Sequence, residues 1–311
     1  MSSGSPESLT AYLAADGFIE PLLEELALAG IAPIEVHGRL ILAPGPPLAA
    51  AWAQNIWRDA VRIPIISIKD GARALRDRQR NWALWPIGHH RRAHLIQEAL
   101  PHVSAKPLIF PTPAPTAPLG SWTLLDSNTI LAAADCSSPF PHGEAVFVED
   151  RVTPPTRAYL KLWEALTLIE RRPVPGETCL DLGASPGGWS WVLQSTGAKV
   201  ISVDRAPLAP NIATLPGIEH RQASAFALSP DSIGPVDWLT SDVICYPARL
   251  LRLVRGWLES GLARNMICSV KFQGPTDHAA AAAFAAIPGA RLIHLHHNKH
   301  ELTWIRLGAP Q

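Results

Sequence analysis

The chain contains few of the residues that mark disulfide frameworks, metal clusters or membrane spans. Only four of its 311 residues are cysteines, and no two of them form a C-x-x-C pair, which excludes a zinc knuckle and a dithiol redox motif. Charged residues make up only 17% of the chain. Even so, no uncharged run that is also free of proline reaches the ~18–20 residues that a membrane helix needs. We therefore expect a cytoplasmic monomer with no metal site and no membrane contact.

The charge is balanced overall but uneven along the chain. With 27 basic and 27 acidic residues, bulk charge predicts no partner, yet residues 56–106 carry ten Lys and Arg against four Asp and Glu. Arg73, Arg76 and Arg80 have the spacing of one helix face. Arg91 and Arg92 follow, among histidines and tryptophans. Such a segment can contact phosphates and stack on bases. The alternative is a solvated helix over buried tryptophans.

Two domains are expected, since 311 residues with 47% hydrophobic content suffice for two cores. Residues 1–145 show mixed strand and helix patterns, including an expected helix at 48–60, and predict a smaller α+β domain. In residues 146–311 strands and helices alternate, and the last two strands read as a hairpin. The predicted strands are 178–182, 199–204, 217–222, 237–241, 266–272, 291–297 and 301–307. This pattern predicts an α/β fold with a mostly parallel seven-stranded sheet and a terminal antiparallel hairpin. Such a sheet is typical of class I, Rossmann-like methyltransferases rather than of dehydrogenases.

The strongest chemical signal lies in residues 179–193, which read as a buried strand, a glycine turn and the start of a helix. Such a turn lets the backbone approach a ligand at a helix N-terminus. A second strand ends in Asp204, a carboxylate suited to a ribose diol. The turn matches neither the G-x-G-x-x-G pattern of dinucleotide sites nor the P-loop. An ordinary strand-to-helix loop is the alternative to a site for an adenosyl and methionine moiety.

Four charged residues accompany this turn. Lys161 lies on the helix before the first strand, Asp242 and Lys271 follow the fourth and fifth strands, and Glu301 opens the last one. In an open α/β sheet the carboxyl ends of the strands face the ligand crevice. A lone lysine at a strand end is usually only solvated. Four charges of alternating sign around one crevice favour a site instead.

These residues and their surroundings resemble the FtsJ-like ribose 2′-O-methyltransferases. The phrases that carry the lysine–aspartate–lysine–glutamate tetrad of that family match residues 156–162, 241–242, 269–271 and 300–303. The likeness extends from near residue 135 to the end, and it covers the N-terminal part only loosely, as a shortened RNA-binding region. It implies S-adenosylmethionine as methyl donor and RNA as partner, with large-subunit ribosomal RNA as the expected substrate.

The resemblance also implies roles for individual residues. Lys271 would accept the proton of a ribose 2′-hydroxyl, and Lys161 would position that hydroxyl. Asp242 would orient Lys271 and face the methyl group, while Glu301 would hold Lys161 or the ribose. A lysine accepts a proton only when it is neutral, and burial beside a second cation lowers the pKa of a lysine in general.

For the methyl donor, the resemblance implies that the turn shapes a methionine pocket and that Asp204 binds the ribose. The expected cofactor-binding residues are Gly183, Ser185, Pro186, Gly187, Gly188, Trp189, Asp204, Ser224 and Asp242. Trp189 is also expected to pack its helix onto the sheet. Ser224 stands where the family often has an acid for the adenine amine, and a hydroxyl can still form a hydrogen bond there.

Two alternatives to this function stay open at the level of the sequence. One is the same chemistry on another RNA, such as tRNA or an mRNA cap, because target choice would depend on the N-terminal domain. The other is an RNA-binding protein on a methyltransferase scaffold that no longer catalyses. That protein would not bind S-adenosylmethionine.

Overall fold

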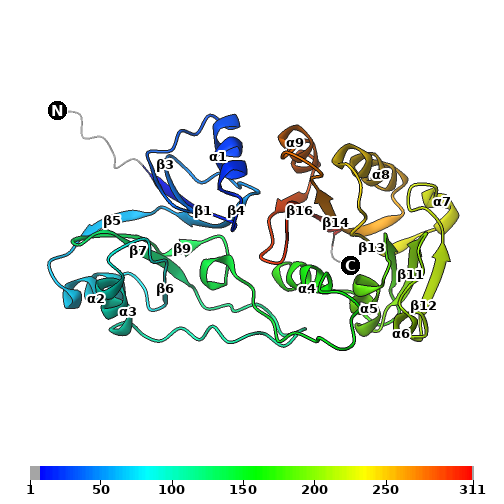
Figure 1. The fold of residues 1–311 in the computed structure, drawn as a ribbon, viewed down its shortest axis with the longest axis horizontal. Helices are drawn as coiled ribbons and strands as arrows, with labels where there is room; N and C mark the ends of the chain where they lie inside the picture. Colours follow the sequence, from blue (N-terminus) through cyan, green and yellow to red (C-terminus); the bar gives the residue numbers. More distant parts are fainter. Residues whose placement is uncertain (1–7, 310–311) are drawn as a thin grey trace. The chain divides into compact units, whose positions relative to one another are not determined.

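A computed structural model describes residues 8–309, which form two compact units (Figure 1). The first unit comprises the chain up to Leu108 together with Ala114–Val146. The second comprises Ile109–Pro113 and the chain from Phe147 onward. Among residues 8–309, no helix has the length and apolar character to cross a membrane.

The first unit contains two sheets, each with its own helices. The five-stranded sheet has the order β2-β3-β1-β4-β9 and is accompanied by helix α1. Its elements are β1 (Leu9–Ala14), α1 (Ile19–Leu28), β2 (Glu35–His37), β3 (Leu40–Pro44), β4 (Ala53–Arg58) and β9 (Asp135–Cys136). The helix predicted at 48–60 is wrong. This segment supplies β4, which pairs with β1 and β9 on its two sides and buries Trp57.

The four-stranded sheet has the order β5-β8-β7-β6, and helices α2 and α3 pack against one another beside it. Its elements are β5 (Val61–Pro64), α2 (Ile68–Arg76), β6 (Trp82–Leu84), α3 (His90–Glu98), β7 (Gly120–Asp126) and β8 (Thr129–Ala133). β7 and β8 pair as an antiparallel hairpin. A short 3-10 turn, η1 (Pro141–Gly143), follows. The core of this sheet contains Trp82 and Trp122, both fully buried.

The second unit is built on a seven-stranded sheet with the order β12-β11-β10-β13-β14-β16-β15. The strands are β10 (Thr178–Leu182), β11 (Lys199–Asp204), β12 (Ile218–Gln222), β13 (Val236–Ser241), β14 (Ala263–Lys271), β15 (Ala290–Ile293) and β16 (Glu301–Arg306). The first five are parallel, and β16 runs antiparallel to both β14 and β15. All seven strands lie where the sequence predicts them, within a few residues at their ends.

Helices cover both faces of this sheet: α4 and α5 lie on one face, and α8 and α9 on the other (Figure 1). The helices are α4 (Tyr159–Leu168), α5 (Gly188–Ser195), α6 (Pro210–Ala213), α7 (Pro230–Ile233), α8 (Pro247–Ser260) and α9 (His278–Ala285). Burial between two layers explains the apolar residues of β10 and of the middle of β14. Asp181 and Lys271, the charged residues near the carboxyl ends of these two strands, are therefore candidates for a functional site.

Candidate active site

The glycine turn lies between β10 and α5, and its close approaches require glycine. Gly183 has a φ of +79°, and a Cβ there would lie 2.7 Å from the Cα of Val243 in the loop after β13. Gly187 has a φ of +114°, and its Cβ would lie 2.7 Å from Cγ2 of Ile212. A side chain at either position would be strained and would collide with its neighbour. The turn therefore fits tightly against the loop after β13 and against α6.

Two aspartates fix this turn from within. Asp181, fully buried in β10, accepts hydrogen bonds from Ser190 Oγ at 2.7 Å and Thr240 Oγ1 at 3.1 Å. Burial raises the pKa of Asp181 to about 7. Asp204, at the end of β11, accepts from the backbone N–H of Ser185 at 3.1 Å and of Ala206 at 2.9 Å. The carboxylate expected to bind a ribose is thus held beside the turn by backbone donors.

The remaining residues of the turn are fixed by contacts of their own. The Ser185 hydroxyl donates to the carbonyl oxygen of Pro207 at 2.8 Å. The Pro186 carbonyl oxygen accepts from the N–H of Ala209 at 2.9 Å. A Cβ on Gly188 would lie 3.3 Å from Thr156 Oγ1. These contacts leave the backbone of the turn, rather than its side chains, to shape a ligand site.

The four predicted charged residues come together. Lys161 Nζ, on α4, lies 2.6 Å from Asp242 Oδ1 and 3.1 Å from Glu301 Oε1. Lys271 Nζ, at the end of β14, lies 3.1 Å from the same Asp242 oxygen and donates to the Asp242 carbonyl oxygen at 2.6 Å. Asp242 therefore bridges the two lysines.

Strand register explains how residues so far apart in sequence meet. β14 and β16 are antiparallel, and Lys271 lies directly opposite Glu301 in their ladder. β13 is the parallel neighbour of β14, so Asp242, the residue after β13, lies at the same sheet edge as Lys271. Only Lys161 comes from a helix.

The electrostatics distinguish the two lysines. Burial lowers the pKa of Lys161, but the carboxylates of Asp242 and Glu301 outweigh it and raise this pKa above its ordinary value. Burial likewise raises the pKa of Asp242, and the two lysines hold it below its usual range. The side chain of Lys161 is 8% exposed, whereas that of Lys271 is 19% exposed. Lys161 is thus a charged, enclosed group, and Lys271 is the more exposed of the two lysines.

A cavity of about 200 Å³ opens next to this cluster. Its lining includes Gly183, Asp204, Ser224 and the loop residues Val243 and Ile244. The Ser224 hydroxyl accepts from the backbone N–H of Phe226 at 3.3 Å, so it also shapes the turn after β12. The cavity has the glycine turn and a carboxylate on its wall, as a nucleoside site needs.

Trp189 packs its helix against the start of α4. The side chain is 3% exposed, and its Nε1 donates to the carbonyl oxygen of Ala158 at 2.9 Å. The ring also lies 5.9 Å from Lys161 Nζ. Trp189 therefore joins α5 to the start of α4, and through α4 it supports the position of Lys161.

Glu164 is a buried acid that the sequence reasoning missed. It lies three residues after Lys161 in α4, and its two carboxyl oxygens accept from the N–H groups of His296 at 2.8 Å and His297 at 3.0 Å. Burial raises the pKa of Glu164 to about 8. A single acid in the apolar run Leu160–Leu168 was the available signal. It ties α4 to the segment that leads into Glu301.

The basic segment of the first unit differs from its prediction in one respect. Arg73 and Arg76 lie on α2, but α2 ends at Arg76, so Arg80 does not share a helix face with them. The Trp82 indole nitrogen donates to the carbonyl oxygens of Leu75 and Gln79, at the end of this helix and just beyond it. Trp82 is fully buried and is therefore a core residue.

The arginines of this segment differ in their existing contacts and in their exposure to solvent. Arg73 pairs with Asp70 at 2.6 Å, and Arg76 donates to the carbonyl oxygen of Ala99 at 2.8 Å. Arg91 is exposed in the first turn of α3, and Arg92 beside it is half-buried. The exposed Arg91 at the start of α3 and the exposed Arg80 before β6 are therefore both available to a partner.

Comparison with known proteins agrees with the geometry of the second unit. Residues 155–262 match the model of a family described as FtsJ-like methyltransferases. Proteins named ribosomal RNA large subunit methyltransferase M are similar to this chain. The one from Halorhodospira halophila is 40% identical over 157 residues, which is 48% of this chain and 46% of that protein. The one from Alkalilimnicola ehrlichii is 35% identical over 186 residues, or 56% and 51%.

The chain spans about half the length of the curated relatives it matches. The family match covers Lys161 and Asp242, and it ends before Lys271 and Glu301. The structure places all four residues in one cluster beside the glycine turn. Through its second unit, the chain is therefore related to the FtsJ-like methyltransferases.

Proposed function

We propose that this chain transfers a methyl group from S-adenosylmethionine to a ribose 2′-hydroxyl in RNA. The observation that carries the proposal is the cluster of Lys161, Asp242, Lys271 and Glu301 next to the cavity at the glycine turn. The sheet order, with one antiparallel strand inserted beside β14, supports the class I methyltransferase fold for the second unit.

The residues of the cavity fit an S-adenosyl donor. Asp204 keeps carboxylate lone pairs available for a ribose diol beyond the two backbone donors that hold it. The glycine turn Gly183–Gly188 would let the backbone approach the methionine moiety, since its glycines carry no side chain. When bound, the donor supplies a sulfonium methyl group that is already activated, so the protein needs only to align the hydroxyl and take its proton.

On the acceptor side, the arrangement assigns the two lysines different tasks. Lys161 stays charged between Asp242 and Glu301, so it can orient the hydroxyl oxygen but cannot take up a proton. Lys271, the more exposed lysine, is held by the carbonyl and carboxyl oxygens of Asp242. In its neutral form Lys271 Nζ would receive the proton of the 2′-hydroxyl while the oxygen bonds to the methyl carbon and the sulfur–carbon bond of the donor breaks. S-adenosylhomocysteine would leave, and the proton would then pass from Lys271 to water.

Large-subunit ribosomal RNA is the substrate we propose, because the similar proteins are named methyltransferases of that RNA. The decisive experiment maps 2′-O-methyl groups in ribosomal RNA from cells with and without this chain. One or a few sites that disappear without the chain and return with it would support the proposal. An unchanged ribosomal map with a lost methyl group in tRNA or an mRNA cap would move the same chemistry to that RNA.

A scaffold without activity is the competing function, and the calorimetric binding of S-adenosylmethionine tests it. An active enzyme is expected to bind the donor, and an idle scaffold is not. We further propose that the first unit contacts the RNA through its basic segment, with the exposed Arg91 and the half-buried Arg92 at the start of α3 among the contacts.

A further inference from the structure

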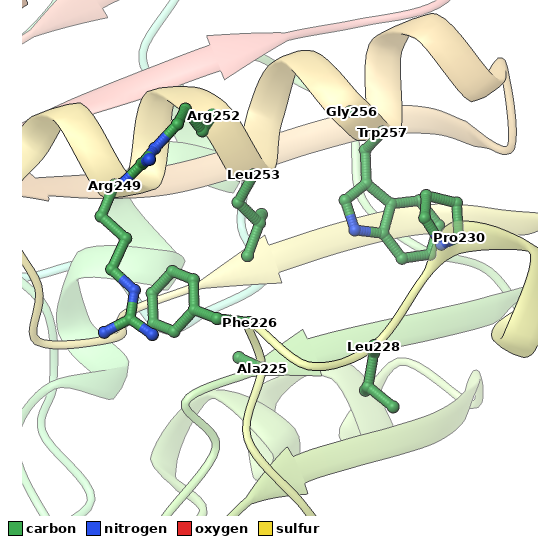
Figure 2. Close-up of a pocket in the computed structure, with 9 residues that line it drawn as sticks. All are labelled: Ala225, Phe226, Leu228, Pro230, Arg249, Arg252, Leu253, Gly256 and Trp257. Carbon is green, nitrogen blue, oxygen red and sulfur yellow. The ribbon is translucent and has the colours of Figure 1, made fainter.

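A second cavity lies beside the cavity of about 200 Å³ described above, which we call the donor cavity. It measures about 350 Å³ and opens between α8 and the segment that joins β12 to α7. Figure 2 shows its apolar side chains Leu228, Leu253 and Trp257 and the guanidinium of Arg249 at one end. A Cβ on Gly256, another lining residue, would meet no atom within 4 Å. The second cavity therefore has room for a small flat group.

The two cavities share part of their lining. Ala225, Phe226 and Arg249 line both of them. The guanidinium carbon of Arg249 lies 3.8 Å from the centroid of the Phe226 ring, in a stacked cation–π contact (Figure 2). Phe226 is in turn held by the hydrogen bond of its N–H to Ser224. The Arg249–Phe226 pair thus forms a partition between the donor cavity and the second cavity.

The Arg249–Phe226 pair lies at the end of the donor cavity where we expect the adenine base of S-adenosylmethionine. If Asp204 binds the ribose and the glycine turn holds the methionine, the adenine extends away from both, toward residues 223–226. The exocyclic amine is on the edge of the purine opposite its bond to ribose, so it points away from Asp204. Asp204 is the one carboxylate among the described residues that line this cavity. At the adenine end of the donor cavity the described lining therefore presents the Phe226 ring and the Arg249 guanidinium instead of a carboxylate.

We propose that Arg249 is a specificity-determining residue: stacked on Phe226, it closes the adenine end of the donor cavity and excludes donors with a substituent on the adenine amine. This inference rests on the proposed function. Its physical basis is that the planar guanidinium can both stack on an aromatic ring and donate to the acceptor nitrogens of a purine. Shortening Arg249 would join the two cavities.

Calorimetry with S-adenosylhomocysteine and its N6-benzyl derivative tests the proposal on the full chain. The wild type is expected to bind the parent compound and to reject the derivative by at least about tenfold. Arg249→Ala should weaken the parent compound by roughly three- to tenfold, the loss of one stacked guanidinium. The same variant should bind the derivative as well as the parent compound or better. Arg249→Met, which keeps the bulk without the donors, should weaken both and preserve the rejection.

Arg252→Ala is the matched control, because Arg252 is exposed on the same helix and lines only the second cavity. It should leave both affinities unchanged. Equal affinity of the wild type for the two compounds, or undiminished rejection by Arg249→Ala with an intact circular dichroism spectrum, would overturn the proposal. A wild type that binds neither compound would instead refute the proposed function on which it rests.

Discussion

At the scale of single residues, the Asp242 carboxylate is the group that links the two lysines of the cluster. Asp242 contacts both lysines, and only Lys161 has a second carboxylate as neighbour. Two carboxylates against one cation keep Lys161 protonated. Lys271, whose ion pair is with Asp242, is the lysine to which the proposed function gives the proton of the substrate. Similar residue types thus acquire different roles from their neighbours.

Replacing Lys271 tests this division. Lys271→Ala is expected to lower kcat by ~10²–10⁴-fold, the usual contribution of a positioned proton acceptor. Lys271→Arg should lose as much, because a guanidinium keeps its proton at any working pH. The measurement is single-turnover methylation of the target RNA at saturating donor. Substantial activity in Lys271→Arg would contradict the role of proton acceptor, because arginine preserves the charge and not the chemistry.

Replacing Asp204 should change the affinity for the donor rather than kcat. Asp204→Asn should weaken the binding of S-adenosylhomocysteine by ~10–100-fold, since it removes a charge-assisted acceptor for the ribose diol. At saturating donor its kcat should stay near that of the wild type, because Asp204 is not part of the charged cluster. Asp231→Asn, an exposed acid in α7, is the control and should change neither value. A variant with lost kcat and unchanged affinity would place Asp204 in the chemistry instead.

At the scale of elements, helix α4 organises more of the site than its sequence suggests. It presents Lys161 to the cluster, and one turn later Glu164 accepts from the backbone of the segment before β16. A buried carboxyl that must satisfy two N–H groups is expensive to replace. Glu164 therefore acts as a positioning residue: it holds the segment before Glu301 against the helix that carries Lys161.

The raised pKa of Glu164 makes a prediction about pH. With a folded-state pKa of about 8 and an ordinary value near 4.5 when unfolded, folding takes up a proton between these values. The contribution of Glu164 to stability is then full below pH ~4.5 and is lost as pH rises toward 8, by up to about 1.4 kcal/mol per pH unit.

Glu164→Gln removes that proton uptake. We expect it to be less stable than the wild type by about 1–3 kcal/mol at pH 5.5, because one N–H loses its acceptor. The difference should shrink as pH rises to 7.5. Urea unfolding of both proteins at pH 5.5, 6.5 and 7.5 measures it. A difference that stays constant over this range would show that Glu164 is already ionised in the folded protein.

The elements also show what sequence patterns can and cannot predict. The strands of the second unit were predictable because burial on both faces leaves apolar runs, and the meeting of Asp242 with Lys271 followed from parallel neighbours. Residues 48–60 were predicted as helix because their alanines suit one, yet pairing with β1 and β9 makes β4 of them. Glu164 was missed because its partners are backbone groups more than 130 residues away. Local pattern cannot contain such a contact.

At the scale of the whole molecule, the similarity to known proteins and the basic segment belong to different units. The family match lies within the second unit, and the basic segment lies within the first. Chemistry and target choice would then be separable properties. A substitution in the basic segment should change RNA affinity and leave the binding of S-adenosylhomocysteine unaffected.

The double variant Arg91→Ala/Arg92→Ala tests this separation. If both side chains contact phosphates, RNA affinity should fall, and the slope of log K against log salt should decrease by about 1.4–1.8. Arg172→Ala, an exposed arginine of the second unit, should change the slope far less. Titration of a ribosomal RNA fragment at four salt concentrations gives the slopes. An unchanged slope would mean that α3 is only a solvated helix.

The opposition of Lys271 and Glu301 in the β14–β16 ladder has a practical consequence for anyone who prepares this protein. A shift of β16 by one residue would turn every side chain of that strand to the other face of the sheet. Such a molecule would have the same helix and strand content, so far-ultraviolet circular dichroism would not distinguish it. Glu301 would nevertheless point away from Lys161. The specific activity of a sample would therefore report the fraction of molecules with correctly paired strands.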